Sequence, residues 1–261
     1  MDLLSYVLSV LLIGAVAGFL ATWLGVGGCF LRIPLMMWLL GLSIKEAYCV
    51  NMAVIALTTI PGVVVHYRNR HVYVRGAVIA GISATLGVIT GTQLVVYTPR
   101  LVLRLIFGIA CAIIGIYVIL RTLKTRGKIP PRITIDQVGR LPIGCKLVGS
   151  MYGAGVATGL CGFGGGIYYV PILADLMKYP VHIAVGTSSA MMILTGGVGA
   201  MNLALHGYFN ALAFIGVGLV TLLFSWLGAK AAKVTQAWIL RIAYGVAISA
   251  VGIVVVLQTI Y

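Results

Sequence analysis

Long stretches without a charged side chain dominate this sequence and limit what it can fold into. Residues 3–31, 76–99 and 147–174 each lack Asp, Glu, Lys and Arg. A helix needs about 20 apolar residues to cross the roughly 30 Å hydrocarbon core of a bilayer, and each stretch is long enough. Only 8% of the residues are charged, against about 25% in soluble domains. The sequence therefore predicts an all-α polytopic membrane protein.

The net charge of +14 lies mostly in short connections between the apolar stretches. Lys and Arg occupy such loops in helical membrane proteins. This placement argues against nucleic acid as a partner, although a soluble chain of this charge would suggest it. We expect a multi-pass protein of the cell membrane, with the lipid bilayer around it.

The sequence contains none of the motifs that would indicate an enzyme or an ATPase. HExxH, GxSxG and GxxxxGK[ST] are absent, and no two of the four carboxylates are close in sequence. The cysteines show no metal-binding spacing and are interpreted as small buried hydrophobic residues. We expect no enzymatic activity, no metal and no cofactor. The five cysteines are Cys29, Cys49, Cys111, Cys145 and Cys161.

Two halves of the chain match at a constant offset of 137 residues. The match begins with Gly25-Val-Gly27-Gly28 and Gly162-Phe-Gly164-Gly165. An unbroken register across Gly, Pro and Arg positions indicates an internal repeat. We predict a first membrane repeat over 1–120, a basic linker over 121–146 and a second membrane repeat over 147–261. Further matched pairs are Pro34 with Pro171, Gly81 with Gly218, Leu103-Arg104 with Leu240-Arg241, and Gly115 with Gly252.

Each half contains five apolar segments, of which the second is short. In the first half it holds 13 residues, about 20 Å of helix, which is less than the membrane core. We predict that the first two segments form a glycine-broken helical hairpin, re-entrant or fully crossing, followed by three spanning helices. Each half then crosses an odd number of times, which makes the second copy inverted. The segments are 3–24, 29–41, 46–66, 76–97 and 101–121, then 147–161, 166–177, 183–204, 211–233 and 238–258.

The distribution of basic residues favours the inverted arrangement. Inverted repeats put fourteen Lys and Arg on the linker side: three over 68–75, seven in the linker and four in the second half. Three lie opposite, at Lys45, Arg100 and Arg104. Repeats in the same orientation would put ten Lys and Arg on the linker side and seven on the opposite side. Because cytoplasmic loops carry the excess of Lys and Arg, we expect a cytoplasmic linker and extracytoplasmic termini.

The glycine clusters at the two breaks are the first candidate for a substrate site. Glycine weakens a helix, and the backbone groups that it frees inside a membrane need partners. In inverted-repeat transporters such breaks lie near the midplane and present N–H groups to anionic substrates. The alternative is close helix packing by small residues. The candidate glycines are Gly25, Gly27, Gly28, Gly162, Gly164, Gly165 and Gly166.

Arg32 is the second candidate, because it lies inside an otherwise uncharged apolar segment. A charged side chain within the membrane is costly and usually functional. The planar guanidinium suits an oxyanion. The alternatives are a structural partner for backbone carbonyls, or a side chain that reaches the membrane surface. Its counterpart in the second half is Tyr169.

Polar side chains on the next helix of each half could complete the shell of an oxyanion. Asn51 aligns with Ser188, which Ser189 follows. Amide and hydroxyl groups at these positions would donate hydrogen bonds without adding charge. Thr58 and Thr195 lie on the same helices, and hydrogen bonding between helices is the favoured interpretation for them.

The remaining titratable residues give weaker signals. Asp175 could be a proton or cation site, but it ends a short segment near Lys178, which favours an ion pair at the membrane surface. The histidines lie near predicted helix ends, where solvated histidines are common, and none has a partner at metal-ligand spacing. They are His66, His71, His182 and His206.

The two glycine motifs resemble those of the TauE/SafE family of sulfite exporters, also called the 4-toluenesulfonate uptake permease family. The resemblance rests on GVGGCFLRIPLM at 25–36, GFGGGIYYVPIL at 162–173, the chain length and the basic central linker. It extends over essentially the whole chain. The first copy departs from the family's GxGGG pattern, since Cys29 stands where the second copy has Gly166.

The resemblance implies a secondary transporter that exports small sulfur oxyanions such as sulfite or organosulfonates. The inside-negative membrane potential alone would expel an anion, with about 2.3 kcal/mol per charge per 100 mV. The alternative is a non-transporting membrane subunit or scaffold of a sulfur-metabolism complex, in which Arg32 and the glycine breaks would have no evident use. A cation channel is disfavoured, because four carboxylates cannot build an acidic ring.

The predicted orientation can be tested by labelling single cysteines. In an otherwise cysteine-free protein, Pro130→Cys should react with a membrane-impermeant thiol reagent only after the cells are opened, because the linker is expected to be cytoplasmic. Labelling of this cysteine from outside intact cells would contradict the inverted arrangement.

Overall fold

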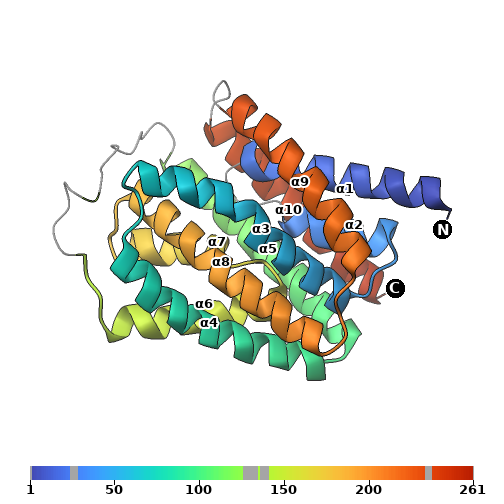
Figure 1. The fold of residues 1–261 in the computed structure, drawn as a ribbon, viewed down its shortest axis with the longest axis horizontal. Helices are drawn as coiled ribbons and strands as arrows, with labels where there is room; N and C mark the ends of the chain where they lie inside the picture. Colours follow the sequence, from blue (N-terminus) through green and yellow to red (C-terminus); the bar gives the residue numbers. More distant parts are fainter. Residues whose placement is uncertain (1, 24–28, 126–134, 136–140, 233–236, 261) are drawn as a thin grey trace. The chain divides into compact units, whose positions relative to one another are not determined.

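The computed structural model describes residues 2–23, 29–125, 135, 141–232 and 237–260. Within these ranges the chain is helical and contains no strand, which confirms the predicted all-α class (Figure 1). In chain order the helices are α1 (Leu3–Trp23), α2 (Cys29–Leu39), α3 (Ile44–Arg68), α4 (Val74–Tyr97), α5 (Arg100–Thr125), α6 (Cys145–Cys161), α7 (Gly166–Pro171), the π-helical η2 (Ile172–Leu176), α8 (Val181–Leu205), α9 (Ala211–Ala232) and α10 (Ala237–Ile260).

Among the described helices, six are long and apolar enough to cross a membrane: α1, α3, α4, α5, α8 and α10. The second element of each half is short, as predicted. α2 has 11 residues, and α7 with η2 covers Gly166–Leu176, so each is about 17 Å long, less than the membrane core. Pro171 precedes the π-helical turn, where its missing N–H disturbs the α-helical pattern. The protein is thus a polytopic helical membrane protein.

The helices form two compact units, and each unit combines helices from both halves of the sequence. The first unit contains α1, α2, α5, α9 and α10, with the start of α3. The second contains the rest of α3, from Asn51 onward, with α4, α6, α7, η2 and α8. A packing unit is not a sequence repeat, so the repeats over 1–120 and 147–261 and the inversion between them stay predictions.

Glycines allow close helix packing inside the first unit, where α1 packs along α9 and α5 along α10. A Cβ added to Gly18 of α1 would come within 2.5 Å of the Thr221 carbonyl oxygen on α9. Gly115 of α5 and Gly245 of α10 similarly face each other's helix backbone. Small residues at such crossings are typical of helices that associate in lipid.

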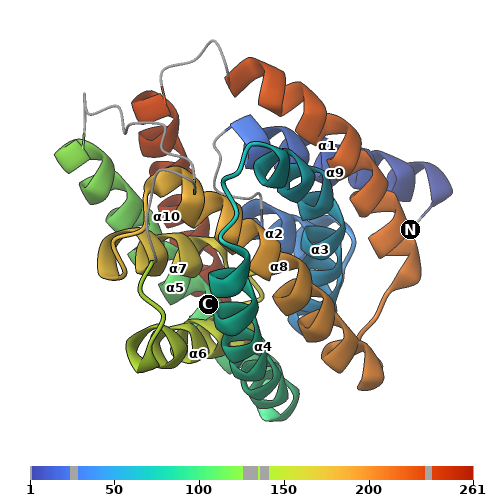
Figure 2. The same cartoon turned by 60° about the vertical axis from the view of Figure 1, so that its left-hand side comes forward.

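The second unit is built around α4, which packs against both α6 and α8. Figures 1 and 2 both show α4 and α6 side by side. Gly87 and Gly91 of α4 meet Gly155 and Gly159 of α6, and a Cβ at any of the four would collide with the opposite backbone. A hydrogen bond from Ser83 Oγ to the Val148 carbonyl, 2.6 Å long, joins the same two helices.

The pairing of helices follows the order of the two halves. The first helix of each half packs against the fourth helix of the other half: α1 against α9, and α6 against α4. The two fifth helices, α5 and α10, pack against each other. Equivalent positions in the two halves therefore make equivalent contacts, which agrees with an internal repeat.

The α4–α6 contact should tolerate no side chain at Gly155. Gly155→Val would drive a Cβ into the Ala84 carbonyl oxygen, and overpacking of this kind costs about 1–3 kcal/mol. We expect the melting temperature of the purified protein to fall by roughly 2–10 °C. Gly153→Val is the matched control on the same helix, since nothing lies within 4 Å of its added Cβ. Equal melting temperatures for the two variants would contradict this account of the contact.

Candidate functional site

The second glycine cluster separates α6 from α7, as predicted. α6 ends at Cys161 and α7 begins at Gly166. Gly162, Gly164 and Gly165 have φ angles of 70°, 71° and 91°, in the left-handed region that side chains with a Cβ rarely adopt. The chain can therefore stop one helix and start the next within four residues only because glycine stands at these positions.

The break leaves a row of backbone donors without acceptors. Within the described part of the chain, the N–H groups of Gly164, Gly165 and Gly166 donate to no protein atom. Gly164 and Gly165 are buried. Buried backbone N–H groups are nearly always hydrogen bonded, and in a membrane there is little water to replace the missing acceptor. The arrangement can thus bind an acceptor from outside the chain, such as an oxyanion.

Asn51 holds the start of the break in place. Its Nδ2 donates to the Gly162 carbonyl oxygen across 2.6 Å, and its side chain is fully buried. The bond joins α3 of the first half to the glycine break of the second half. The structure therefore brings the predicted residue to the predicted break, where one of its amide hydrogens already has a protein acceptor.

Tyr169 adds a buried hydroxyl group beside the break. The residue is 0% exposed, and a Cβ added to Gly165 would collide with its ring. Its Oη lies close enough to the hydroxyls of Thr158 and Thr195 to interact with them. No contact of this Oη within the described residues has hydrogen-bond geometry, and both threonines donate to carbonyls of their own helices. The Tyr169 hydroxyl can therefore donate to a ligand.

The predicted serines lie on α8 with their hydroxyl hydrogens engaged. Ser188 Oγ and Ser189 Oγ both donate to the Val185 carbonyl, at 3.0 and 2.8 Å. A hydroxyl has one hydrogen, so each serine would have to rotate before donating to a ligand. Thr58 and Thr195 also bond to the preceding turn of their own helix, where we had expected bonds between helices.

Arg32 lies in the first unit, on α2, and is 1% exposed. Cys29, which is also buried, lies one turn earlier on the same helix. A buried guanidinium is stable only where charged or polar partners compensate for lost hydration. Of the described acidic residues, Asp2 and Asp175 are exposed, and Glu46 accepts a hydrogen bond from the Ser43 N–H at the start of α3.

The predicted glycines of the first half, Gly25, Gly27 and Gly28, lie outside the described residues. Arg32 belongs to the first unit, whereas Asn51, Ser188, Ser189 and the second glycine cluster belong to the second. The structure thus brings together, within the second unit, Asn51 and the glycines from 162 to 166. Tyr169 joins them. The sequence pointed to this residue only as the repeat counterpart of Arg32, 137 positions earlier.

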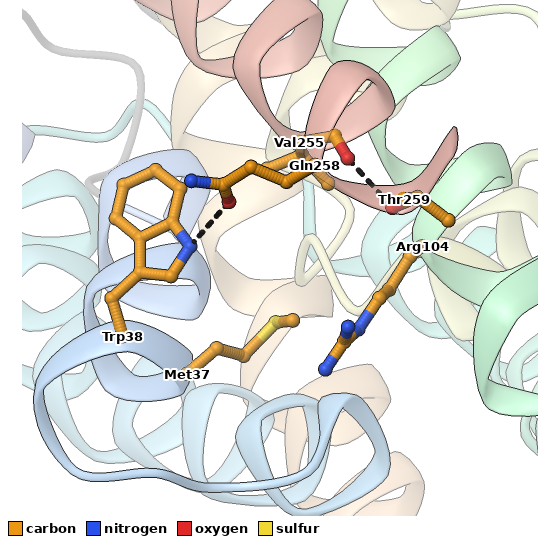
Figure 3. Close-up of a pocket in the computed structure, with 6 residues that line it drawn as sticks. All are labelled: Met37, Trp38, Arg104, Val255, Gln258 and Thr259. Carbon is orange, nitrogen blue, oxygen red and sulfur yellow. Dashed lines mark hydrogen bonds between the residues drawn. The ribbon is translucent and has the colours of Figure 1, made fainter. Parts of the chain in front are cut away.

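A cavity of about 290 Å³ lies within the first unit, among the ends of α2 and α10 and the start of α5 (Figure 3). Trp38 Nε1 donates to Gln258 Oε1 across 2.9 Å at its edge. Arg104 supplies its charged side chain. None of the predicted site residues lines it. The lining residues are Met37, Trp38, Arg104, Val255, Gln258 and Thr259.

Comparison with known proteins gives relatives along most of the chain. A "Probable membrane transporter protein" of Xylella fastidiosa is 30% identical over 226 residues, covering 83% of this chain and 84% of the relative. A "Probable membrane transporter protein MJ0441" of Methanocaldococcus jannaschii is 24% identical, and the match covers 82% of this chain and 79% of the relative. A "Probable membrane transporter protein YdhB" of Bacillus subtilis is 23% identical, and the match covers 86% of this chain and 88% of the relative.

No solved structure matches the chain. The model of the family described as "Sulfite exporter TauE/SafE" matches residues 10–255. The match includes both glycine motifs, Arg32 and all the spanning helices except the outer ends of α1 and α10. The chain therefore belongs to the TauE/SafE sulfite exporter family.

Proposed function

We propose that this membrane transporter carries small sulfur oxyanions such as sulfite, and that the anion binds at the glycine break of the second unit. The observation that carries the proposal is the row of N–H groups at Gly164, Gly165 and Gly166, which have no acceptor among the described residues. Three adjacent donors suit the oxygens of a small oxyanion, and backbone N–H groups recognise anions widely in proteins.

Three further features support an anionic substrate. The Tyr169 hydroxyl lies over Gly165 and can donate to an oxygen atom. In the other unit, the repeat counterpart of Tyr169 is the buried Arg32. A chain with eighteen basic and four acidic residues places few negative charges near a permeating anion. The proposed substrate is carried without chemical change, and the membrane potential drives its export.

Transport should be measured in proteoliposomes loaded with sulfite, thiosulfate, sulfate or taurine, under an imposed inside-negative potential. We expect saturable sulfite efflux, and Tyr169→Phe should weaken sulfite binding about 10- to 100-fold. This range corresponds to one hydrogen bond to a charged group, worth about 1.5–3 kcal/mol. Binding is measured calorimetrically on the purified variant.

Tyr168→Phe is the control for Tyr169→Phe, because it removes the same atom from a half-buried neighbour that stacks on Phe163. Its sulfite affinity should equal that of the unchanged protein. If none of the four compounds left the proteoliposomes faster than it leaves liposomes without protein, the proposed substrate class would be overturned. Unchanged affinity in Tyr169→Phe would remove the hydroxyl from the site.

Arg32 lies in the first unit and is tested as an anion contact separate from the glycine break of the second unit. Arg32→Lys should weaken sulfite binding, because an ammonium lacks the planar bidentate contact of a guanidinium. Arg32→Gln should weaken it further, by about one to two orders of magnitude, because the charge is lost. Affinity and melting temperature are measured on the same samples, with the exposed Arg100→Gln as control. A lower melting temperature with unchanged sulfite affinity would assign Arg32 a structural role.

A further inference from the structure

Three of the four histidines come together at one end of the second unit. His66 lies near the end of α3, His71 in the turn before α4, and His182 in the first turn of α8. The His71 ring centroid is 5.9 Å from that of His66 and 5.4 Å from that of His182. The rings of His71 and His182 are stacked, with an interplanar angle of 27°. All three residues are partly buried. We call these residues the histidine cluster.

Backbone contacts hold the three segments of the histidine cluster together. A Cβ added to Gly186 of α8 would collide with the His71 carbonyl oxygen, so the turn lies directly on α8. The Tyr73 N–H donates to Thr187 Oγ1 across 3.1 Å, and the His71 N–H donates to the His66 carbonyl across 2.9 Å. The contact between the turn and α8 thus includes a close backbone approach and a hydrogen bond.

The histidine cluster lies on the linker side of the second unit. The N–H of the linker residue Ile135 donates to the Arg70 carbonyl, in the same turn as His71. α8 runs antiparallel to α3, since Gly186 lies near His66 while Gly196 lies near Met52. The cluster therefore joins the linker-side ends of α3 and α8, the helices that carry Asn51 and Ser188.

The backbone on both sides of the histidine cluster adopts a rare conformation. Arg70 has a φ of 55° and Lys178 a φ of 60°. Among the described residues these are the two non-glycine positions with positive φ. Such conformations persist where the surrounding contacts enforce them, and they often mark segments that move.

Imidazoles are the groups near this contact that change charge between pH 5 and 8. The charged side chains of the surrounding segments are Arg68, Arg70, Arg75, Asp175 and Lys178, and all five are exposed. The Tyr73 ring packs edge-on against Tyr179, and burial raises the pKa of the Tyr179 hydroxyl to about 12. We therefore infer that acidification acts on this contact through the imidazoles.

We propose that the histidine cluster is a proton-operated latch that controls the linker-side end of α8. With neutral rings, the stack keeps the α3–α4 turn on α8. Protonation places like charges on rings 5.4 to 5.9 Å apart in a partly buried position, and the repulsion releases the turn from α8. Protons on the linker side thereby regulate the transporter. The last statement rests on the proposed function, whereas the latch does not.

The latch is tested by amide hydrogen exchange on the purified full-length protein at pH 7.5 and 5.5, corrected for the intrinsic effect of pH on exchange. Protection of the 66–74 and 183–188 segments should fall about tenfold at pH 5.5, which corresponds to about 1.4 kcal/mol. The double variant His66→Gln with His182→Gln should show no such fall. Equal protection of the unchanged protein at both pH values would overturn the latch.

His206→Gln is the matched control, because His206 lies exposed just after the opposite end of α8 and contacts only its own helix, through Nδ1 and the Asn202 carbonyl. It should keep the full pH response. If the double variant does not fold, His71→Gln serves instead, since His71 contacts both other rings. A pH response that survives loss of the rings would also overturn the latch.

The link to transport is tested by the ratio of sulfite flux in the unchanged protein to that in the double variant. This ratio cancels the effect of pH on sulfite itself. We expect it to change about fivefold or more between linker-side pH 7.5 and 5.5, which corresponds to about 1 kcal/mol. A constant ratio would overturn the regulation of transport. The exchange experiment contains no substrate, so its outcome is independent of the proposed substrate class.

Discussion

The need to satisfy backbone hydrogen bonds away from water governs this protein. Helices meet that need within a membrane, and the described chain is helical almost throughout. Among the described residues, the break between α6 and α7 is an exception, because the N–H groups of Gly164, Gly165 and Gly166 have no protein acceptor there. A membrane protein can retain such a break where another molecule supplies the acceptor, which is why the break is the centre of the proposed site.

Glycine performs two different tasks in this chain. In the break, Gly162, Gly164 and Gly165 adopt positive φ angles that end one helix and begin another. At the α4–α6 contact, Gly87 and Gly155 are helical and matter because they have no side chain. Without a hydrophobic driving force in lipid, close backbone contact supplies much of the helix association. The two tasks cannot be told apart from glycine content, and only backbone angles and neighbours separate them.

Much of the fold followed from periodicity, length and charge, but the site followed only in part. The short elements α2 and α7–η2 and the break at Gly162 were predicted, because glycine and proline act locally on the backbone. The hydrogen bond from Asn51 to the break was not, since it joins residues 111 positions apart. The histidines lie near helix ends as predicted, but the sequence did not indicate that the rings of three of them meet.

The sequence by itself determined the membrane class, the short second element of each half and the position of the second break. These depend on local composition and on the thickness of the bilayer. The tertiary structure alone decided that Tyr169 covers Gly165, that the Ser188 and Ser189 hydroxyls bond to Val185, and that His66, His71 and His182 meet. Contacts between distant helices depend on how side chains pack at each crossing, and a single sequence carries no record of that packing.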